Sequence, residues 1–85
     1  MNNKKTLRRM FDNYALKALK ADKKSQHEAS TTLRWLDCFL LGEEIYNLEV
    51  ARVQYLNQTS NAKTKTDAKQ NFNIACKVVR TRLFK

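Results

Sequence analysis

Residues 33–42 read Leu-Arg-Trp-Leu-Asp-Cys-Phe-Leu-Leu-Gly, and the first nine of them are the most apolar run in the chain. Their apolar side chains cover most of the circumference of a helix, so a helix formed here needs neighbours on several sides. Residues 25–28, Ser-Gln-His-Glu, match a capping box and mark a helix start. The pattern predicts a long central helix from about residue 26 to about Asn57.

Gly42 is the point at which this helix either breaks or bends. A glycine inside a helix costs about 1 kcal/mol relative to alanine, which packing can offset. We therefore favour a continuous or slightly bent central helix, with a break at Gly42 as the alternative.

Two further amphipathic patterns flank the central one. Apolar residues recur at spacings of three and four over residues 3–23, and again from Thr66 or Asp67 to the end of the sequence, after a polar stretch at 57–65 that is typical of a loop. The chain has no Pro and one Gly, which favours helices over a turn-rich β fold. The sequence therefore predicts an all-α fold, a small bundle of three main helices in a single domain over residues 1–85.

The charge is arranged in three blocks. Residues 1–24 carry a net charge of +6, residues 25–58 a net charge of −3 and residues 59–85 a net charge of +6, which makes the total of +9. If each block forms one helix, the acidic middle can lie against its basic neighbours and offset part of the excess. The remaining positive charge favours anionic partners and steers encounters with them.

The sequence contains no recognisable catalytic or ligand-binding motif. It has no Gly-rich phosphate loop and no cluster of His and Cys at metal-ligand spacing, and His27 is its single histidine. Glu43 and Glu44 are adjacent, so on a helix they point in different directions and do not form an acid pair. We expect no enzyme activity, no catalytic residue, no cofactor and no metal site.

Cys38 and Cys76 each have an apolar neighbour, in Asp37-Cys38-Phe39 and Ala75-Cys76-Lys77, and we expect both to be small buried side chains. No secretory segment precedes them, and the run at 33–41 is too short for a bilayer, which needs about 20 apolar residues. The expected location is therefore the cytoplasm, where thiols stay reduced.

Trp35 belongs to a residue type that is enriched at binding hot spots. The run at 33–41 also has more apolar surface than two short helices can cover. We therefore hypothesise a partner-binding patch, with charged residues from the first and third helices that orient the partner; its members are Trp35, Phe39, Leu40, Arg8, Arg9 and Arg80. The partner is a protein, or a second copy of the chain in a homo-oligomer. The competing interpretation places Trp35 in the core.

Nucleic-acid binding is the alternative function. Basic first and third helices would contact phosphates with little sequence preference and strong salt dependence. A helix-turn-helix centred on Gly42 does not fit, because its recognition helix over residues 43–49 would bring three carboxylates towards the phosphates. Contact of the first helix with an anionic membrane surface is a third interpretation, but its apolar side is explained more simply as bundle core.

Three segments carry a resemblance to a known family: residues 1–6 (MNNKKT), 31–45 (TTLRWLDCFLLGEEI) and 62–79 (AKTKTDAKQNFNIACKVV). In these segments and in length, the chain resembles the RIII family of rapid-lysis proteins of T-even bacteriophages, over most of its sequence. The resemblance implies a small antiholin in the host cytoplasm that delays lysis. The partners it implies are the soluble part of a holin and another antiholin. It assigns no binding residues, because the shared segments contain no functional motif.

Overall fold

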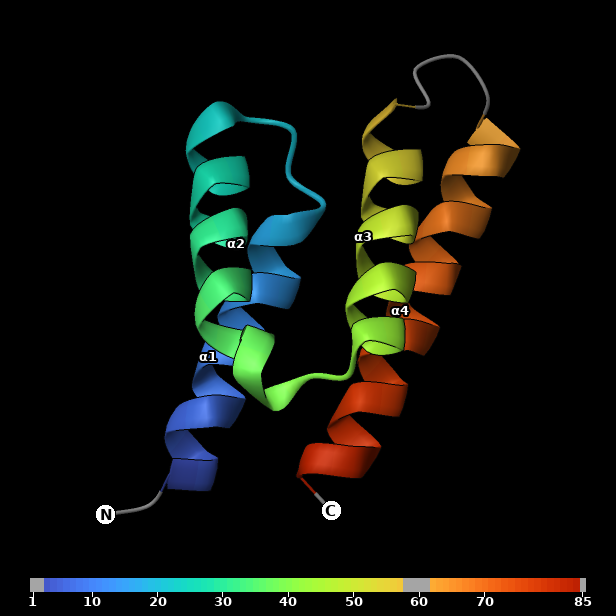
Figure 1. The fold of residues 1–85 in the computed structure, drawn as a ribbon. Helices are drawn as coiled ribbons and strands as arrows, with labels where there is room; N and C mark the ends of the chain where they lie inside the picture. Colours follow the sequence, from blue (N-terminus) through green and yellow to red (C-terminus); the bar gives the residue numbers. More distant parts are fainter. Residues whose placement is uncertain (1–2, 58–61, 85) are drawn as a thin grey trace.

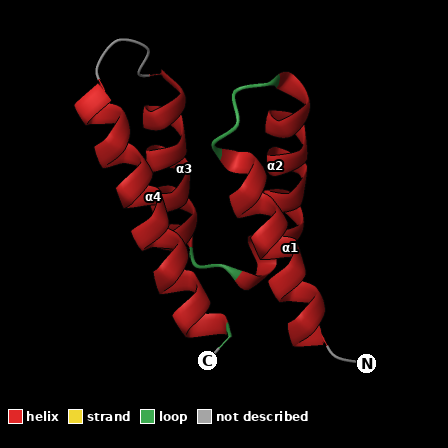
Figure 2. Cartoon of the chain, turned by 180° about the vertical axis from the view of Figure 1, so that it is seen from behind, coloured by secondary structure: helices red, strands yellow, loops and turns green. Residues whose placement is uncertain are grey.

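The computed structural model describes residues 3–57 and 62–84. Its elements, in chain order, are α1 (Asn3–Ala18), α2 (Lys23–Leu36), the 3-10 turn η1 (Asp37–Phe39), α3 (Gly42–Asn57) and α4 (Ala62–Leu83). Figure 1 shows two antiparallel hairpins, α1–α2 and α3–α4, standing side by side. Seen from behind in Figure 2, the same hairpins are joined by the short connection between α2 and α3. The predicted all-α bundle is confirmed, with four helices in the described residues.

The central segment forms two helices rather than the long helix that we favoured. α2 ends at Leu36, η1 follows, and Leu40 has an extended backbone with φ −107° and ψ 150° before α3 begins. A single helix over residues 26–57 would be about 48 Å long, and two shorter neighbours could not cover its apolar circumference. The break lets α3 fold back, so that each half buries one side against the rest of the bundle.

Two helix starts also differ from the expected ones. Asp22 is the N-cap of α2, because its carboxylate accepts a hydrogen bond from the Ser25 N–H at 2.9 Å. This bond to the Ser25 backbone lowers the pKa of Asp22, and Ser25 is a buried first-turn residue instead of the cap. Residues 62–65 of the expected loop are helical, whereas residues 58–61 lie outside the described residues. α1 ends at Ala18, a turn earlier than predicted.

The core forms where the two hairpins meet. Tyr14 of α1 packs against Phe72 of α4 with ring centroids 6.0 Å apart, and Phe11 lies 6.3 Å from Phe84 by the same measure. These tilted aromatic pairs join the first and last helices. The other members of the buried cluster are Ala18, Ala29, Leu36, Leu40, Leu48, Ala51, Cys76 and Val79. All four helices therefore share one core.

The cysteines have different environments. Both are free thiols, but Cys38 is exposed whereas Cys76 is buried, so the expectation of burial is wrong for Cys38. Cys38 lies in η1, where the chain leaves the helical path of α2. Burial raises the pKa of the Cys76 thiol to about 11.

We expect a thiol-specific reagent at pH 8 to modify Cys38 rapidly and Cys76 only after denaturant is added, because the thiolate is the reactive form and Cys76 is both buried and protonated. The measurement is the number of thiols that have reacted as a function of time, with and without urea. Cys38→Ser is the matched control and should remove the fast phase. Reaction of both thiols at one rate in the folded protein would contradict the placement of Cys76.

The break at 37–41 does not depend on the conformational freedom of Gly42. No described glycine has a positive φ, and a Cβ added at Gly42 would meet nothing within 4 Å. We expect Gly42→Ala to raise the free energy of unfolding by about 0.4–1 kcal/mol, because alanine restricts the unfolded chain. Urea denaturation checks this, with Ala29→Gly as a destabilising control in α2. A less stable Gly42→Ala protein would mean that the connection requires glycine.

Candidate functional site

Trp35 lies on the surface of α2, with 69% of the residue exposed. Beside it is a hollow of about 400 Å³ between α1 and α2, lined by Arg9, Met10, Asn13, Thr32 and Trp35. We call this site the α1–α2 hollow. The core interpretation of Trp35 is therefore wrong, and its indole ring is available to a partner.

The connection between α2 and α3 exposes further apolar side chains. Phe39 is 49% exposed and Leu41 is 55% exposed, whereas Leu40 between them is 8% exposed and belongs to the core. The extended backbone at Leu40 sends neighbouring side chains to opposite sides of the chain. We call Phe39 and Leu41 the apolar corner. Leu40, which the sequence placed in the binding patch, is a core residue.

Arg82 of α4 holds the apolar corner in place. Its guanidinium donates to the Glu44 carboxylate, with Nε 2.7 Å from Oε2 and a second bond to Oε1, and to the Phe39 carbonyl at 2.9 Å. Glu44 also accepts from the Leu41 N–H at 2.9 Å, which satisfies a backbone donor at the start of α3. Glu44 of α3 and Arg82 of α4 thus fix this connection together.

The three basic residues expected to orient a partner do not lie together. Arg9 lines the α1–α2 hollow. Arg80 forms an ion pair of 3.1 Å with Asp12, and the guanidinium carbon of Arg8 lies 6.0 Å from the centre of the Phe84 ring. Arg8 and Arg80 therefore join α1 to the C-terminal half of α4, and of the three only Arg9 lines the hollow.

The acidic middle of the chain pairs with both basic blocks, as the charge pattern suggested. Lys17 of α1 and Glu28 of α2 are 3.2 Å apart, and Arg82 of α4 pairs with Glu44 of α3. Part of the basic charge is thus neutralised inside each hairpin.

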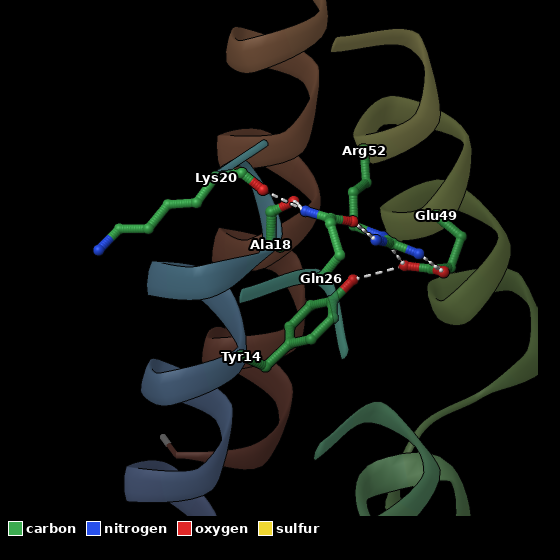
Figure 3. Close-up of polar contacts among 6 residues, drawn as sticks. All are labelled: Tyr14, Ala18, Lys20, Gln26, Glu49 and Arg52. Carbon is green, nitrogen blue, oxygen red and sulfur yellow. Dashed lines mark hydrogen bonds and ion pairs between the residues drawn. The ribbon is translucent and has the colours of Figure 1, made fainter. Parts of the chain in front are cut away.

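Figure 3 shows a polar network between the hairpins that the sequence did not reveal. The Tyr14 hydroxyl donates to Glu49 at 2.8 Å, and Arg52 donates two bonds of 2.8 Å to the same carboxylate. Burial, and then the charge of Glu49, raise the pKa of Tyr14 far above its ordinary value. Periodicity predicted that Tyr14 is buried, but no local pattern indicates an acceptor that lies 35 residues away.

Gln26 extends this network to the turn between α1 and α2. Its amide oxygen accepts from Arg52, and its amide nitrogen donates to the Ala18 carbonyl at 3.0 Å and to the Lys20 carbonyl. The last carbonyls of α1 need such donors, because they have no partner within the helix. The sequence does not indicate this role of Gln26, because residues 25–28 match a capping box in which Gln26 has no special function.

Among residues 3–57 and 62–84, no helix has the combination of length and apolarity that crossing a bilayer requires. In the same residues, no group of three His, Cys, Asp or Glu side chains could hold a metal ion. Comparison with protein-family models, with curated proteins and with solved structures finds no match for this chain. The geometry above is therefore the basis for a functional proposal.

The Glu44–Arg82 pair gives the fold a dependence on pH. The hydrogen bond from Arg82, and then the one from the Leu41 N–H, outweigh burial and lower the pKa of Glu44 below its usual 4.5. A carboxylate with a lowered pKa stabilises the folded state above that usual value, and the contribution is lost as the pH falls through the folded pKa.

We therefore expect Glu44→Gln to lower the free energy of unfolding by about 1 kcal/mol at pH 7, a modest value because Arg82 is partly exposed to solvent. The difference from the unsubstituted protein should shrink at pH 3. Urea denaturation at the two pH values measures it, and Glu43→Gln is the control at an exposed neighbour. An equal difference at both pH values would show that the charge of Glu44 is not what stabilises the corner.

Proposed function

We propose that this chain is a small non-enzymatic regulator that acts by binding another protein through the α1–α2 hollow and the apolar corner. The exposure of Trp35 is the observation that carries the proposal. Tryptophan is among the residues that contribute most to interfaces, where the large ring fills a pocket on the partner and excludes water. Here the ring stands beside a hollow of about 400 Å³ that a partner side chain could fill in return.

The supporting structure is suited to binding because it is held in place before a partner arrives. α1 and α2 are tied by the Lys17–Glu28 ion pair of 3.2 Å, and Arg82 fixes the apolar corner by hydrogen bonds. A site that is already ordered loses less conformational entropy on binding. The expected complex therefore needs little rearrangement of this chain.

The charge near the hollow defines the kind of partner. Arg9 lines it, and the chain as a whole carries a net charge of +9. The partner that fits is an apolar segment with acidic residues beside its anchor, since opposite charges speed encounter and fix orientation. The resemblance to the rapid-lysis proteins supports a partner class of this kind: the cytoplasmic part of a holin or another antiholin, bound in the host cytoplasm so that lysis is delayed.

Trp35→Ala tests the proposal against a holin's cytoplasmic segment made as a peptide. Trp35 is the sole tryptophan, so its fluorescence should shift to shorter wavelength when the peptide binds. Trp35→Ala should weaken binding, measured by calorimetry, by at least about 30-fold, the size of a hot-spot loss. Its helical circular dichroism should be unchanged, because exposed substitutions alter stability by about 0.5 kcal/mol or less.

Two further variants separate binding from folding. Leu40→Ala, in the core next to the corner, should lower the free energy of unfolding by about 2–5 kcal/mol. Tyr46→Ala, at another exposed ring, should leave peptide binding intact. If Trp35→Ala binds the peptide as tightly as the unsubstituted protein does, the proposal is wrong. Tight binding of duplex DNA or RNA at 0.15 M salt, lost when Arg8, Arg9, Lys77 and Arg80 are changed to Glu, would favour the nucleic-acid alternative instead.

A further inference from the structure

α3 is apolar on two opposite sides, although one of these sides faces solvent. Leu48 and Ala51 are buried in the core, while Tyr46, Val50 and Val53 are exposed. Positions 46, 50 and 53 are separated by four and three residues, so they share one face of the helix. The sequence shows this excess as apolar residues that flank the main stripe after Gly42.

The exposed face of α3 continues onto α4 across a groove. The groove has a volume of about 290 Å³ and is lined by Val50 and Ala51 of α3 and by Ile74, Ala75 and Val78 of α4. Ile74 and Val78 are 54% and 55% exposed. We call the surface formed by Tyr46, Val50, Val53, Ile74 and Val78 the outer face.

The polar groups of the groove are three amides and the Glu44 carboxylate, whose charge is already paired with Arg82. Asn47, Gln54 and Asn71 line it together with the apolar side chains. An amide both donates and accepts hydrogen bonds, so a surface that carries amides is complementary to an identical surface.

The outer face also lacks the excess charge of the rest of the chain. The charged residues that share its helix positions or line its groove are Glu43, Glu44, Lys63, Asp67, Lys77 and Arg82, and their charges cancel. The chain carries a net charge of +9, so two copies that met through their basic surfaces would repel each other. Contact through a neutral face avoids this repulsion, which salt screens over about 8 Å at physiological ionic strength.

We propose that the outer face binds the outer face of a second copy of this chain, in a dimer with two-fold symmetry. In such a dimer the same patch of both copies forms the interface, and each residue pair occurs twice. A patch can pair with its own copy in this way when it is apolar, has no net charge and carries amides that both donate and accept. Ala51 and Ala75 at the groove leave room for the partner's exposed side chains. The α1–α2 hollow belongs to the other hairpin, so the dimer presents two such hollows.

Sedimentation equilibrium of the full chain over a range of concentrations tests this dimer. The unsubstituted protein should show a concentration-dependent monomer–dimer equilibrium, and Ile74→Glu should raise its dissociation constant by at least about tenfold by burying a charge in the interface. Leu16→Glu is the matched control, because Leu16 is an exposed apolar residue of α1 and the substitution adds the same charge. It should leave the equilibrium unchanged.

A second variant guards against a folding defect. Ile74→Ala introduces no charge and should still weaken the dimer while keeping the helical circular dichroism. Three results would overturn the proposal. The first is a protein that stays monomeric up to about 1 mM, because a dissociation constant above that value means very weak association. The second is a dimer of Ile74→Glu that is as tight as that of the unsubstituted protein. The third is loss of the dimer in Trp35→Ala, which would place self-association at the α1–α2 hollow.

Discussion

The Glu49 carboxylate is the point on which the arrangement of the two hairpins depends. It accepts a hydrogen bond of 2.8 Å from Tyr14 of α1 and two from Arg52 of its own helix. A partly buried carboxylate is costly to strip of its partners, since the charge would then be neither hydrated nor paired. The aromatic contacts between α1 and α4 supply apolar burial but tolerate sliding, whereas the hydroxyl of Tyr14 must meet one acceptor. The network therefore fixes how one hairpin is rotated against the other.

The polar contacts of α3 explain why this helix can carry so apolar an outer face. Of the four charged residues of α3, Glu44 binds Arg82, and Glu49 and Arg52 bind each other at 2.8 Å. These three stand at fixed contacts with the rest of the bundle, and Glu43 is the one left at positions that face outwards. Because three of its four charged residues are held by contacts within the bundle, α3 has few charges left for its solvent-exposed side. An apolar surface in a chain of net charge +9 is a consequence of where the acidic residues are needed.

The sequence predicted the fold class well because that class follows from composition and periodicity, which are local. It favoured a continuous central helix and offered a break only at Gly42, whereas the chain leaves the helix at 37–41, because η1 forms without proline or glycine and the apolar run continues through it. That error also explains the errors at single residues. Leu40 lies beyond the end of α2, where the backbone is extended, so it is in the core although the sequence placed it in one surface patch with Trp35. Residues 25–28 match a capping box, but the Ser25 N–H that Glu28 would bind in that motif donates to Asp22 instead, so Asp22 is the cap.

The α1–α2 hollow and the outer face lie on different hairpins, and this separation has a thermodynamic consequence. Substitutions at sites that share no partners usually have additive effects, so changes at Trp35 and at Ile74 should act independently as long as the bundle is intact. Few polar contacts join the two hairpins, chiefly the Tyr14–Glu49 hydrogen bond and the Asp12–Arg80 ion pair. A change at Glu49 differs from a change at either surface, because it removes the hydrogen bond from Tyr14 that joins the two hairpins. Binding at one surface can influence the other only to the extent that it shifts the angle between the hairpins, and the Tyr14–Glu49 hydrogen bond restricts that shift.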